Sequence, residues 1–521
     1  MEKKTFEELP APVIEYINTL ETRIEQLNEL LRLAQKARFG SSSEQLKYIL
    51  DGQISFFNEA EVCADDNAPE PVIIEKHLRK KKRTKEELAK DLPVREVVIS
   101  IPENERVCNI CEGDLHPIGR EFVRRELCFI PAQAYVTDTY RENFSCDECI
   151  KETDEANIIK PEVPEPVVKR GLASPSSAAY VMYQKFVNAM PLYRQEKDWA
   201  NFGVNISRAT LANWIIYTSL NWLMPLWETL KEILLASTVI FADETVVQVL
   251  KEPGKTPQSE SRMWVYCTGS RCGPPVILFE YQPTRGGEHP KAFLDGAKPG
   301  FFLQTDGYAG YNSVKCAIHC GCWAHLRRKF NDAMPKNPPK DNMAFIGLAF
   351  CQKLFKLEDG WTKLSSQDRL RQRLERSKPV LDEFFAWVQN VNPLAGSKLA
   401  EAIVYARNQK EPLSVFLTDG RIEISTNRVE NAIRPFAVGR KNFLFAETVN
   451  GAKASAIAYS IIETAKANGL NPYQYLLFLF TQLPNVFAKN PQADLSPFLP
   501  WGDGAQLNCR FAQNCDGQLM L

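Results

Sequence analysis

Short apolar runs in the middle of the chain limit its possible folds more than any other feature. They are Val239–Phe241, Met263–Cys267, Val276–Tyr281 and Phe301–Gln304, with a further candidate at Cys316–Cys320. Runs of this length, rich in Val, Ile and Phe, predict buried strands. The segments 175–235 and 341–408 consist mainly of helix formers. The sequence therefore predicts a multidomain α/β protein.

Three acidic residues stand out beside these elements. Asp243 directly follows the first run and Asp306 the fourth, where the end of a strand can hold a side chain rigidly and still expose it. Glu430 lies five residues before Pro435, which predicts a short helix or a turn entering one. Carboxylates are ligands for hard cations, and two Mg²⁺ (or Mn²⁺) ions about 3.5–4 Å apart can act on a phosphodiester. Each acid alone is equally an ordinary solvent-facing residue, because the chain carries 64 Asp and Glu.

The motifs around these acids carry a family resemblance. They are Ala242-Asp243-Glu244-Thr245, Gln304-Thr305-Asp306-Gly307-Tyr308, Cys322-Trp323-Ala324-His325-Leu326-Arg327-Arg328-Lys329-Phe330, Gly439-Arg440-Lys441-Asn442-Phe443-Leu444-Phe445, and the later run Ile461–Pro472. In this order, over nearly the whole chain, they resemble DDE transposases of the insertion sequence 66 family. Where the family usually shows an Asp-Asn-Asn-like approach to the glutamate, this chain has Ser425-Thr426-Asn427.

The resemblance implies an RNase H-like catalytic core in which Asp243, Asp306 and Glu430 hold two Mg²⁺ ions. It further implies a DNA transposase of a bacterial insertion sequence, acting in the cytoplasm. Such an enzyme cleaves transposon ends and joins the 3′-hydroxyls to target DNA, with no covalent enzyme–DNA intermediate. The expected partners are double-stranded DNA (terminal inverted repeats and target) and accessory proteins of the same element. Two alternatives remain, namely a transposon-derived, non-catalytic DNA-binding protein and a metal-dependent nuclease on the same fold.

Basic and polar residues near the acids are candidates for holding DNA. They are Arg327, Arg328, Lys329, Asn427, Arg434, Arg440 and Lys441. An ion pair with Glu430 is an alternative role for Arg434, which follows one turn later. Cys320, Cys322 and His325 have ligand chemistry for a metal, but a core histidine flanked by buried thiols is the commoner arrangement.

Two Cys-x-x-Cys pairs predict a structural zinc site. Cys108, Cys111, Cys146 and Cys149 can supply four thiolates in tetrahedral geometry, which leaves no open position for catalysis. The intervening residues predict two strands, at 126–130 and 134–140. Fourteen cysteines without an export signal favour one zinc ion per chain over disulfides. The alternative is a pair of unligated dithiols on a small domain.

The N-terminal segment predicts self-association. Its apolar residues alternate at steps of four and three, as in a coiled-coil seam: Val13, Ile17, Leu20, Ile24, Leu27, Leu31 and Ala34. A stripe this narrow favours a partner helix over docking on its own chain. An acidic stretch and the basic block 76–85 follow, and they suit either a charged linker or phosphate binding without sequence preference.

Residues 193–217 resemble a helix-turn-helix. One helix is expected at 193–202, a break at Gly203, and a second helix at 207–217 capped by Ser207. Arg208, Thr210 and Asn213 would then begin a recognition helix. A plain helical connector is the alternative.

Bulk composition sets the remaining limits. The 521 residues carry a net charge of −1, so DNA binding must come from local basic surfaces. No run of 18 apolar residues occurs, so no membrane span is expected. Residues 452–467 predict an amphipathic helix, and Asn471-Pro472 the start of another.

The expected domains follow from these features. They are a coiled-coil helix (1–50), a charged linker (51–92), a zinc-binding domain (93–160), a helix-turn-helix-like region (161–235), the catalytic core in two parts (236–330 and 409–470), an all-helical insertion between them (331–408), and a C-terminal helix and tail (471–521).

Overall fold

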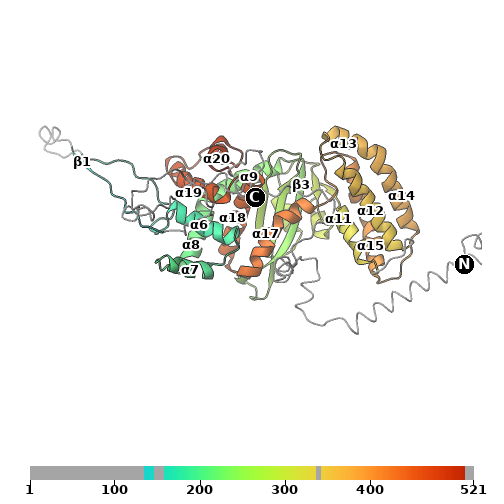
Figure 1. The fold of residues 1–521 in the computed structure, drawn as a ribbon, viewed down its shortest axis with the longest axis horizontal. Coiled ribbons are helices and arrows are strands. Elements are labelled where there is room, and N and C mark those ends of the chain that lie inside the picture. The colour runs from blue at the N-terminus through green and yellow to red at the C-terminus, as the bar shows by residue number, and fades with distance from the viewer. Residues whose placement is uncertain (1–133, 146–157, 336–341, 511–521) are drawn as a thin grey trace, which may run out of the picture. The chain divides into compact units, whose positions relative to one another are not determined.

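A mixed β-sheet forms the centre of the structure, a computed structural model that describes residues 134–145, 158–335 and 342–510 (Figure 1). Its strands are β3 (Val239–Lys251), β4 (Glu260–Thr268), β5 (Ile277–Gln282), β6 (Phe302–Gln304) and β7 (Ile318–Cys320), with β8 (Ala446–Thr448) paired to the far end of β3. In space the order is β5-β4-β3-β6-β7. The first three strands form an antiparallel meander, whereas β6 runs parallel to β3 and β7 parallel to β6.

The strand predictions are confirmed, but the predicted end of the first strand is wrong. β3 does not stop at Asp243 but continues for eight further residues to Lys251. Beyond Asp243 the strand still pairs with β4 as far as Gln248. It also keeps an apolar alternation, with Val247 and Val249 buried. Asp243 therefore lies inside a paired strand, where its backbone is held on the β4 side.

Further helices precede the sheet, lie between its strands or follow it. They are α6 (Pro175–Phe186), α7 (Leu192–Asn201), α8 (Arg208–Thr218), the π-helical turn η3 (Ser219–Leu223), α9 (Met224–Leu235), α10 (Glu288–Phe293), α17 (Asn427–Phe443), α18 (Val449–Ala467), α19 (Pro472–Lys489) and, near the described C-terminal end, η7 (Ser496–Phe498) and α20 (Asp503–Asn508). These bounds confirm the helical character predicted for 175–235 and the helix that begins after Asn471.

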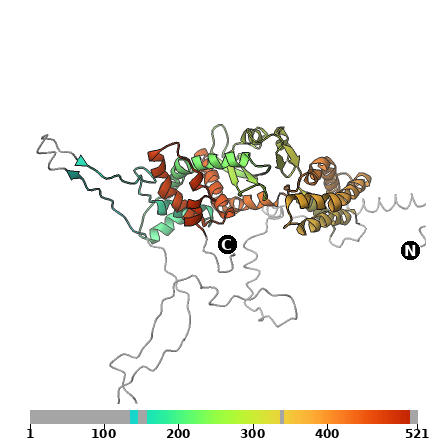
Figure 2. The ribbon, with the colours of Figure 1, turned by 90° about the horizontal axis from the view of Figure 1, so that it is seen from above.

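A second group of helices separates β7 from α17. It comprises α11 (Trp323–Asp332), α12 (Met343–Asp359), α13 (Ser366–Gln372), η5 (Arg373–Ser377), α14 (Lys378–Asn390), α15 (Lys398–Asn408), α16 (Lys410–Ser414) and η6 (Val415–Leu417). α12 to α15 stay together as one bundle in both views (Figure 1, Figure 2). We call α12, α13, η5, α14 and α15 the helical insertion. Its helices confirm the predicted structure of this part of the chain.

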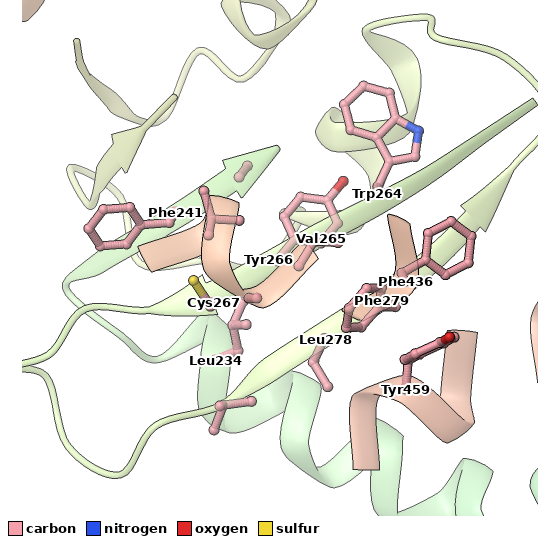
Figure 3. Packing of buried hydrophobic residues seen from close by; sticks show 14 of the residues in the cluster. Leu234, Phe241, Trp264, Val265, Tyr266, Cys267, Leu278, Phe279, Phe436 and Tyr459 are labelled. Atoms are coloured by element: carbon pink, nitrogen blue, oxygen red, sulfur yellow. The ribbon is translucent and has the colours of Figure 1, made fainter. Parts of the chain in front are cut away.

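Packing against the sheet places α17 and α18. Phe279 of β5 lies against Phe436 of α17 and Tyr459 of α18, with ring centroids 6.3 Å and 5.4 Å away (Figure 3). On the other face of the sheet, Tyr266 stacks on Phe293 of α10 at 3.8 Å. Both faces are therefore covered.

The prediction that residues 452–467 form an amphipathic helix is wrong in one respect. The helix exists, but residues 456–465 are buried without interruption. Ser460 and Thr464, which the sequence places on a polar face, bond to the backbone of edge strand β5: Ser460 Oγ accepts from Phe279 N at 2.7 Å, and Thr464 Oγ1 accepts from Ile277 N at 3.0 Å. Their hydroxyls thereby cover a strand edge that would otherwise be unpaired.

Two further predictions concern the N-terminal part of the chain. The strand predicted at 134–140 is wrong, because these residues form no regular secondary structure. The short ladder found nearby joins β1 (Phe144–Ser145) to β2 (Ile158–Ile159) instead. The heptad seam, the charged linker, the four predicted zinc ligands and the strand at 126–130 lie outside the described residues. No helix among the described residues is both long and apolar enough to cross a membrane.

Candidate functional site

The register of the sheet places Asp243 and Asp306 side by side. β3 and β6 pair in parallel through Phe241 and Gln304, and both aspartates lie two residues beyond this last pair. Extending the register brings them to the same level on neighbouring chain segments, which run about 4.8 Å apart. Gly307, with φ of +92°, then turns the chain away from the sheet in a conformation that favours glycine. Asp306 stabilises this turn, because its Oδ1 accepts from Tyr308 N at 2.8 Å.

Glu430 reaches the same region from α17. It lies in the first turn of a 17-residue helix that continues through Pro435, so the prediction of a short helix is wrong. Thr426 donates its hydroxyl to Glu430 Oε1 at 3.3 Å. The Nδ1 of His325 lies 3.7 Å from the same oxygen, and Arg328 Nη2 lies 3.6 Å from Oε2. Among the described residues, Glu430 therefore pairs with His325 and Arg328 rather than with Arg434.

The electrostatics show that the three acids share one neighbourhood. Burial raises the pKa of Asp243 to about 7, and the charges of Glu244, Asp306 and Glu430 add to the rise. A hydrogen bond from Glu244 N to Asp243 Oδ1, at 2.8 Å, opposes it. Repulsion among like charges at one site is what a bound cation relieves.

The donor set fits a hard cation chemically but is not gathered into a finished site. Asp243, Asp306 and Glu430 offer only carboxylate oxygens, the ligands that Mg²⁺ prefers. Within the described ranges, no three Asp, Glu, His or Cys side chains are grouped so that they could hold a metal ion. Mg²⁺ is usually bound through one or two carboxylates together with water and substrate phosphates, so a pair of these acids can hold it without a third protein ligand.

Glu244 was missed as a separate feature by the sequence reasoning. Its side chain is only 3% exposed. It accepts from Arg285 Nε at 2.7 Å and from the Tyr311 hydroxyl at 2.7 Å. The Arg285 guanidinium also lies over the ring of Tyr308 at 3.9 Å. Because side chains alternate along a strand, Glu244 points to the opposite face from Asp243 and anchors β3 to the loops that follow β5 and β6.

The buried thiol of Cys322 bonds to Thr426, the residue that precedes α17. Cys322 Sγ accepts from both the backbone N and the hydroxyl of Thr426, at 3.2 Å and 3.1 Å. Cys320 is also buried. Buried thiols therefore flank His325 on its N-terminal side.

The predicted DNA-holding residues on α11 and α17 have different surroundings. Arg327 packs on the ring of Phe355 at 5.5 Å, and Lys329 packs on that of Tyr405 at 5.2 Å. Of this basic run, Arg328 is the residue that lies beside Glu430. Arg440 is only partly exposed and donates to the carbonyl of Val246 and to the hydroxyl of Thr245 at 3.3 Å.

Three of the predicted DNA-holding residues form an exposed stripe on α17. Arg434 and Lys441 are exposed. At 100° per residue they lie within about 40° of Glu430 around the helix axis. Asn427 lies about 60° from Glu430 on the same side, next to Arg434 around the axis. The stripe therefore leads from the carboxylate along one face of α17.

Two helices form in the segment for which a helix-turn-helix is predicted. α7 and α8 are joined by a turn in which Gly203 has φ of +82°. Ser207 caps α8 and accepts from Thr210 N at 3.2 Å. Arg208, Thr210 and Asn213 are exposed, whereas Leu211, Trp214 and Ile215 of the same helix are buried. The candidate recognition face is therefore presented outward.

Comparison with known proteins identifies the family to which these segments belong. The family model for the Transposase IS66 family matches residues 170–454, and that for the IS66 C-terminal element matches 460–501. A zinc-finger binding domain of transposase IS66 matches 105–149, and a model described as Transposase C of IS166 homeodomain matches 26–97.

Three relatives match most of this chain and most of their own length. Three proteins of Sinorhizobium fredii (strain NBRC 101917 / NGR234), all named as uncharacterized, are similar to this chain. y4qI is 30% identical over 92% of this chain and 89% of its own, and y4hP is 28% identical over 93% and 88%. y4jD is 30% identical over 80% and 81%. From the core to the zinc-finger segment, the chain belongs to the IS66 family of transposases.

Proposed function

We propose that this transposase cleaves DNA at the ends of its element and joins the resulting 3′-hydroxyls to target DNA, using Asp243, Asp306 and Glu430. The observation that carries the proposal is the shared register level of the two aspartates, with α17 bringing Glu430 into the same electrostatic neighbourhood. The strand order, an antiparallel meander followed by two parallel strands, supports an RNase H-like core.

The three carboxylates would hold two Mg²⁺ (or Mn²⁺) ions. Such ions, when bound, supply Lewis-acid activation of the attacking hydroxyl and charge stabilisation at the leaving oxygen. The raised pKa of Asp243 means that this carboxyl is mostly ionised only above about pH 7. No side-chain nucleophile is needed, so hydrolysis and end joining can share this site.

The surrounding residues would orient the DNA. Arg328 lies beside Glu430, where its guanidinium can bind a phosphate next to the scissile one. Arg434 and Lys441 extend positive charge along α17 away from the carboxylate. These contacts carry no sequence information, because they address phosphates.

Recognition of the terminal repeats would fall to other parts of the chain. The exposed residues Arg208, Thr210 and Asn213 at the start of α8 suit contacts to base edges in a major groove. The zinc-finger segment would hold one structural Zn²⁺ through Cys108, Cys111, Cys146 and Cys149. The N-terminal heptads would pair two copies so that both ends are held together.

Conservative substitutions of the acids test this proposal. Asp243→Asn, Asp306→Asn and Glu430→Gln keep size but remove the charge that would bind the cation. Each should abolish Mg²⁺-dependent cleavage of linear DNA bearing the element's ends, while binding of that DNA persists. Asp382→Asn, an exposed acid of α14 paired with Lys378, is the matched control and should cleave normally.

The products distinguish the competing functions. Cleavage followed by joining into a target plasmid supports a transposase mechanism at this site, whereas cleavage without joining identifies a nuclease. End binding without any cleavage by the wild-type protein identifies a DNA-binding protein only. Near wild-type cleavage by any of the three variants would refute the assignment of that acid.

A further inference from the structure

Within the helical insertion, a buried ion pair includes an arginine that also hydrogen-bonds the turn before α17. Arg373 of η5 is completely buried, and Glu358 of α12 is 5% exposed. The Arg373 guanidinium donates to both oxygens of Glu358, at 2.7 Å from Nε and 2.9 Å from Nη2. Its remaining donors go to three backbone carbonyls: Phe416 at 2.7 Å, Asp419 at 3.0 Å and Ile422 at 2.8 Å. All five N–H groups of the guanidinium are therefore used.

Arg369 and a close backbone contact at Gly420 hold the same turn beside that pair. Arg369, also bonded to Glu358, donates to the carbonyl of Gly420 at 3.3 Å. Gly420 itself is pressed against α13, because a Cβ at this position would lie 1.8 Å from the carbonyl oxygen of Ser366. The insertion thus holds residues 416–422 by charge, by hydrogen bonds and by close backbone contact.

From this turn the chain runs as a strap, residues 422–426, that the catalytic core holds from its other side. Gln304 Nε2 donates to the carbonyl of Glu423 at 2.6 Å. The backbone N of Trp323 donates to the carbonyl of Ile424 at 3.1 Å. The strap then reaches Thr426, which precedes α17 and hydrogen-bonds Glu430. Gln304 ends β6, two residues before Asp306, so the strap is tied to the strand that carries the second aspartate.

We propose that Arg373 is a positioning residue for Glu430, through which the helical insertion sets the place of the third carboxylate relative to Asp243 and Asp306. This inference rests on the proposed catalytic function of these acids. Without Arg373, the turn 416–422 would lose three of its hydrogen bonds to the insertion, and α17 would begin from a strap that the insertion holds less firmly. The insertion is thereby part of the active-site scaffold even though its Arg373 touches none of the three acids.

Physical chemistry favours this role over simple stabilisation. A buried ion pair often gives no net stability over an apolar pair, because desolvation offsets the attraction. What arginine adds is a rigid planar fork that can fix several acceptors at defined directions. Here three of those acceptors are carbonyls of one turn.

Two variants perturb the turn by different means. Arg373→Lys keeps the charge opposite Glu358 but cannot supply the fork to three carbonyls and a carboxylate. Gly420→Ala changes no charge and forces the turn away from Ser366. Val388→Ala, a buried position at the far end of α14, serves as a control that weakens the insertion without touching the turn.

Two measurements on the full chain read out the effect. In Mg²⁺-dependent end cleavage, both turn variants should lower kcat, by on the order of 10²-fold for a displacement near 1 Å, with KM for end DNA little changed. In hydrogen exchange without metal or DNA, amides of 423–430 should exchange faster in both variants. Val388→Ala should alter neither kcat nor exchange at 423–430 at temperatures where the insertion remains folded.

The outcomes separate this inference from the catalytic proposal. Wild-type kcat and wild-type exchange at 423–430 in Arg373→Lys and Gly420→Ala would overturn the positioning role. An equal loss of kcat in Val388→Ala would also overturn it, because the effect would then follow insertion stability alone. If Glu430→Gln cleaves normally, the catalytic proposal fails, yet faster exchange at 423–430 would still support the control of this strap by Arg373.

Discussion

Replacement of Asp243 by Asn should stabilise the metal-free protein while abolishing its activity. Burial and the charges of Glu244, Asp306 and Glu430 raise the pKa of Asp243 from 3.8 to about 7. Because the native state binds this proton more tightly than the unfolded chain does, ionising Asp243 costs native stability. The cost begins near pH 4, grows through the interval in which the unfolded chain is ionised and the native one is not, and is complete above about pH 7.

The magnitude follows from the width of that interval. Each pH unit between the two pKa values corresponds to about 1.4 kcal/mol, so a rise from 3.8 to about 7 corresponds to at most about 4 kcal/mol at pH 8. Asparagine has the same shape and carries no charge. Its side-chain oxygen can also keep the bond from Glu244 N, which is 2.8 Å long in the native protein.

Urea unfolding measures this difference. Wild type and Asp243→Asn are unfolded in buffer without Mg²⁺, and unfolding is followed by tryptophan fluorescence. The variant should match wild type near pH 4 and exceed it by a few kcal/mol at pH 8. Asp382→Asn, which removes an exposed acid, should show no such pH-dependent difference. A variant that is equally or less stable than wild type at pH 8 would refute the reasoning, because Asp243 would then not be ionised at a cost.

Other predictions address the rest of the chain. Cys108→Ser should reduce bound zinc from about one per chain toward none and unfold its module, as elemental analysis and thermal melting can establish. Leu20→Glu with Leu27→Glu should weaken self-association in sedimentation and reduce paired-end cleavage more than single-end nicking, since a buried charge costs several kcal/mol. Arg208→Ala and Asn213→Ala should each weaken binding of terminal-repeat DNA by about 1–3 kcal/mol, measured against unrelated DNA, with core stability unchanged.

Local signals allowed much of the fold to be predicted. Strand-like runs identified β3 to β7 because their apolar composition reflects burial on both faces. Cap residues located two helices, since Ser207 and Asn471 each accept from the first turn of the helix they precede. These features depend on residues close in sequence, so they can be predicted from the sequence alone.

The wrong predictions concern features that depend on contacts between residues far apart in the sequence. Asp243 was placed at a strand end, but β8, about 200 residues later, pairs with the continuing strand. Residues 452–467 were predicted to form an amphipathic helix, but Ser460 and Thr464 are buried because edge strand β5 supplies partners for their hydroxyls. Arg373 carries no local sign of its role, because its three carbonyl acceptors lie more than 40 residues away.

The candidate site was predictable in identity but not in geometry. The acids were found through the motifs around them, whereas their mutual placement depends on the β3–β6 register and on the strap before α17. Glu244 illustrates the limit. Its sequence neighbour Asp243 drew attention to the motif, yet only the fold reveals that Arg285 and Tyr311 bury Glu244 on the opposite face.

The same charges predict that Mg²⁺ stabilises the wild-type protein more than it stabilises Asp243→Asn. If Mg²⁺ binds the ionised cluster in the native state only, it stabilises wild type by about 1.4 kcal/mol for each tenfold excess over its Kd. The gain should be full above about pH 7 and shrink at lower pH, where Asp243 binds a proton instead. Urea unfolding with increasing Mg²⁺ at pH 8 and pH 5 measures both. Asp243→Asn and Glu430→Gln should lose most of the gain, because each removes a charged ligand. Equal stabilisation of wild type and both variants would show that Mg²⁺ acts elsewhere on the protein.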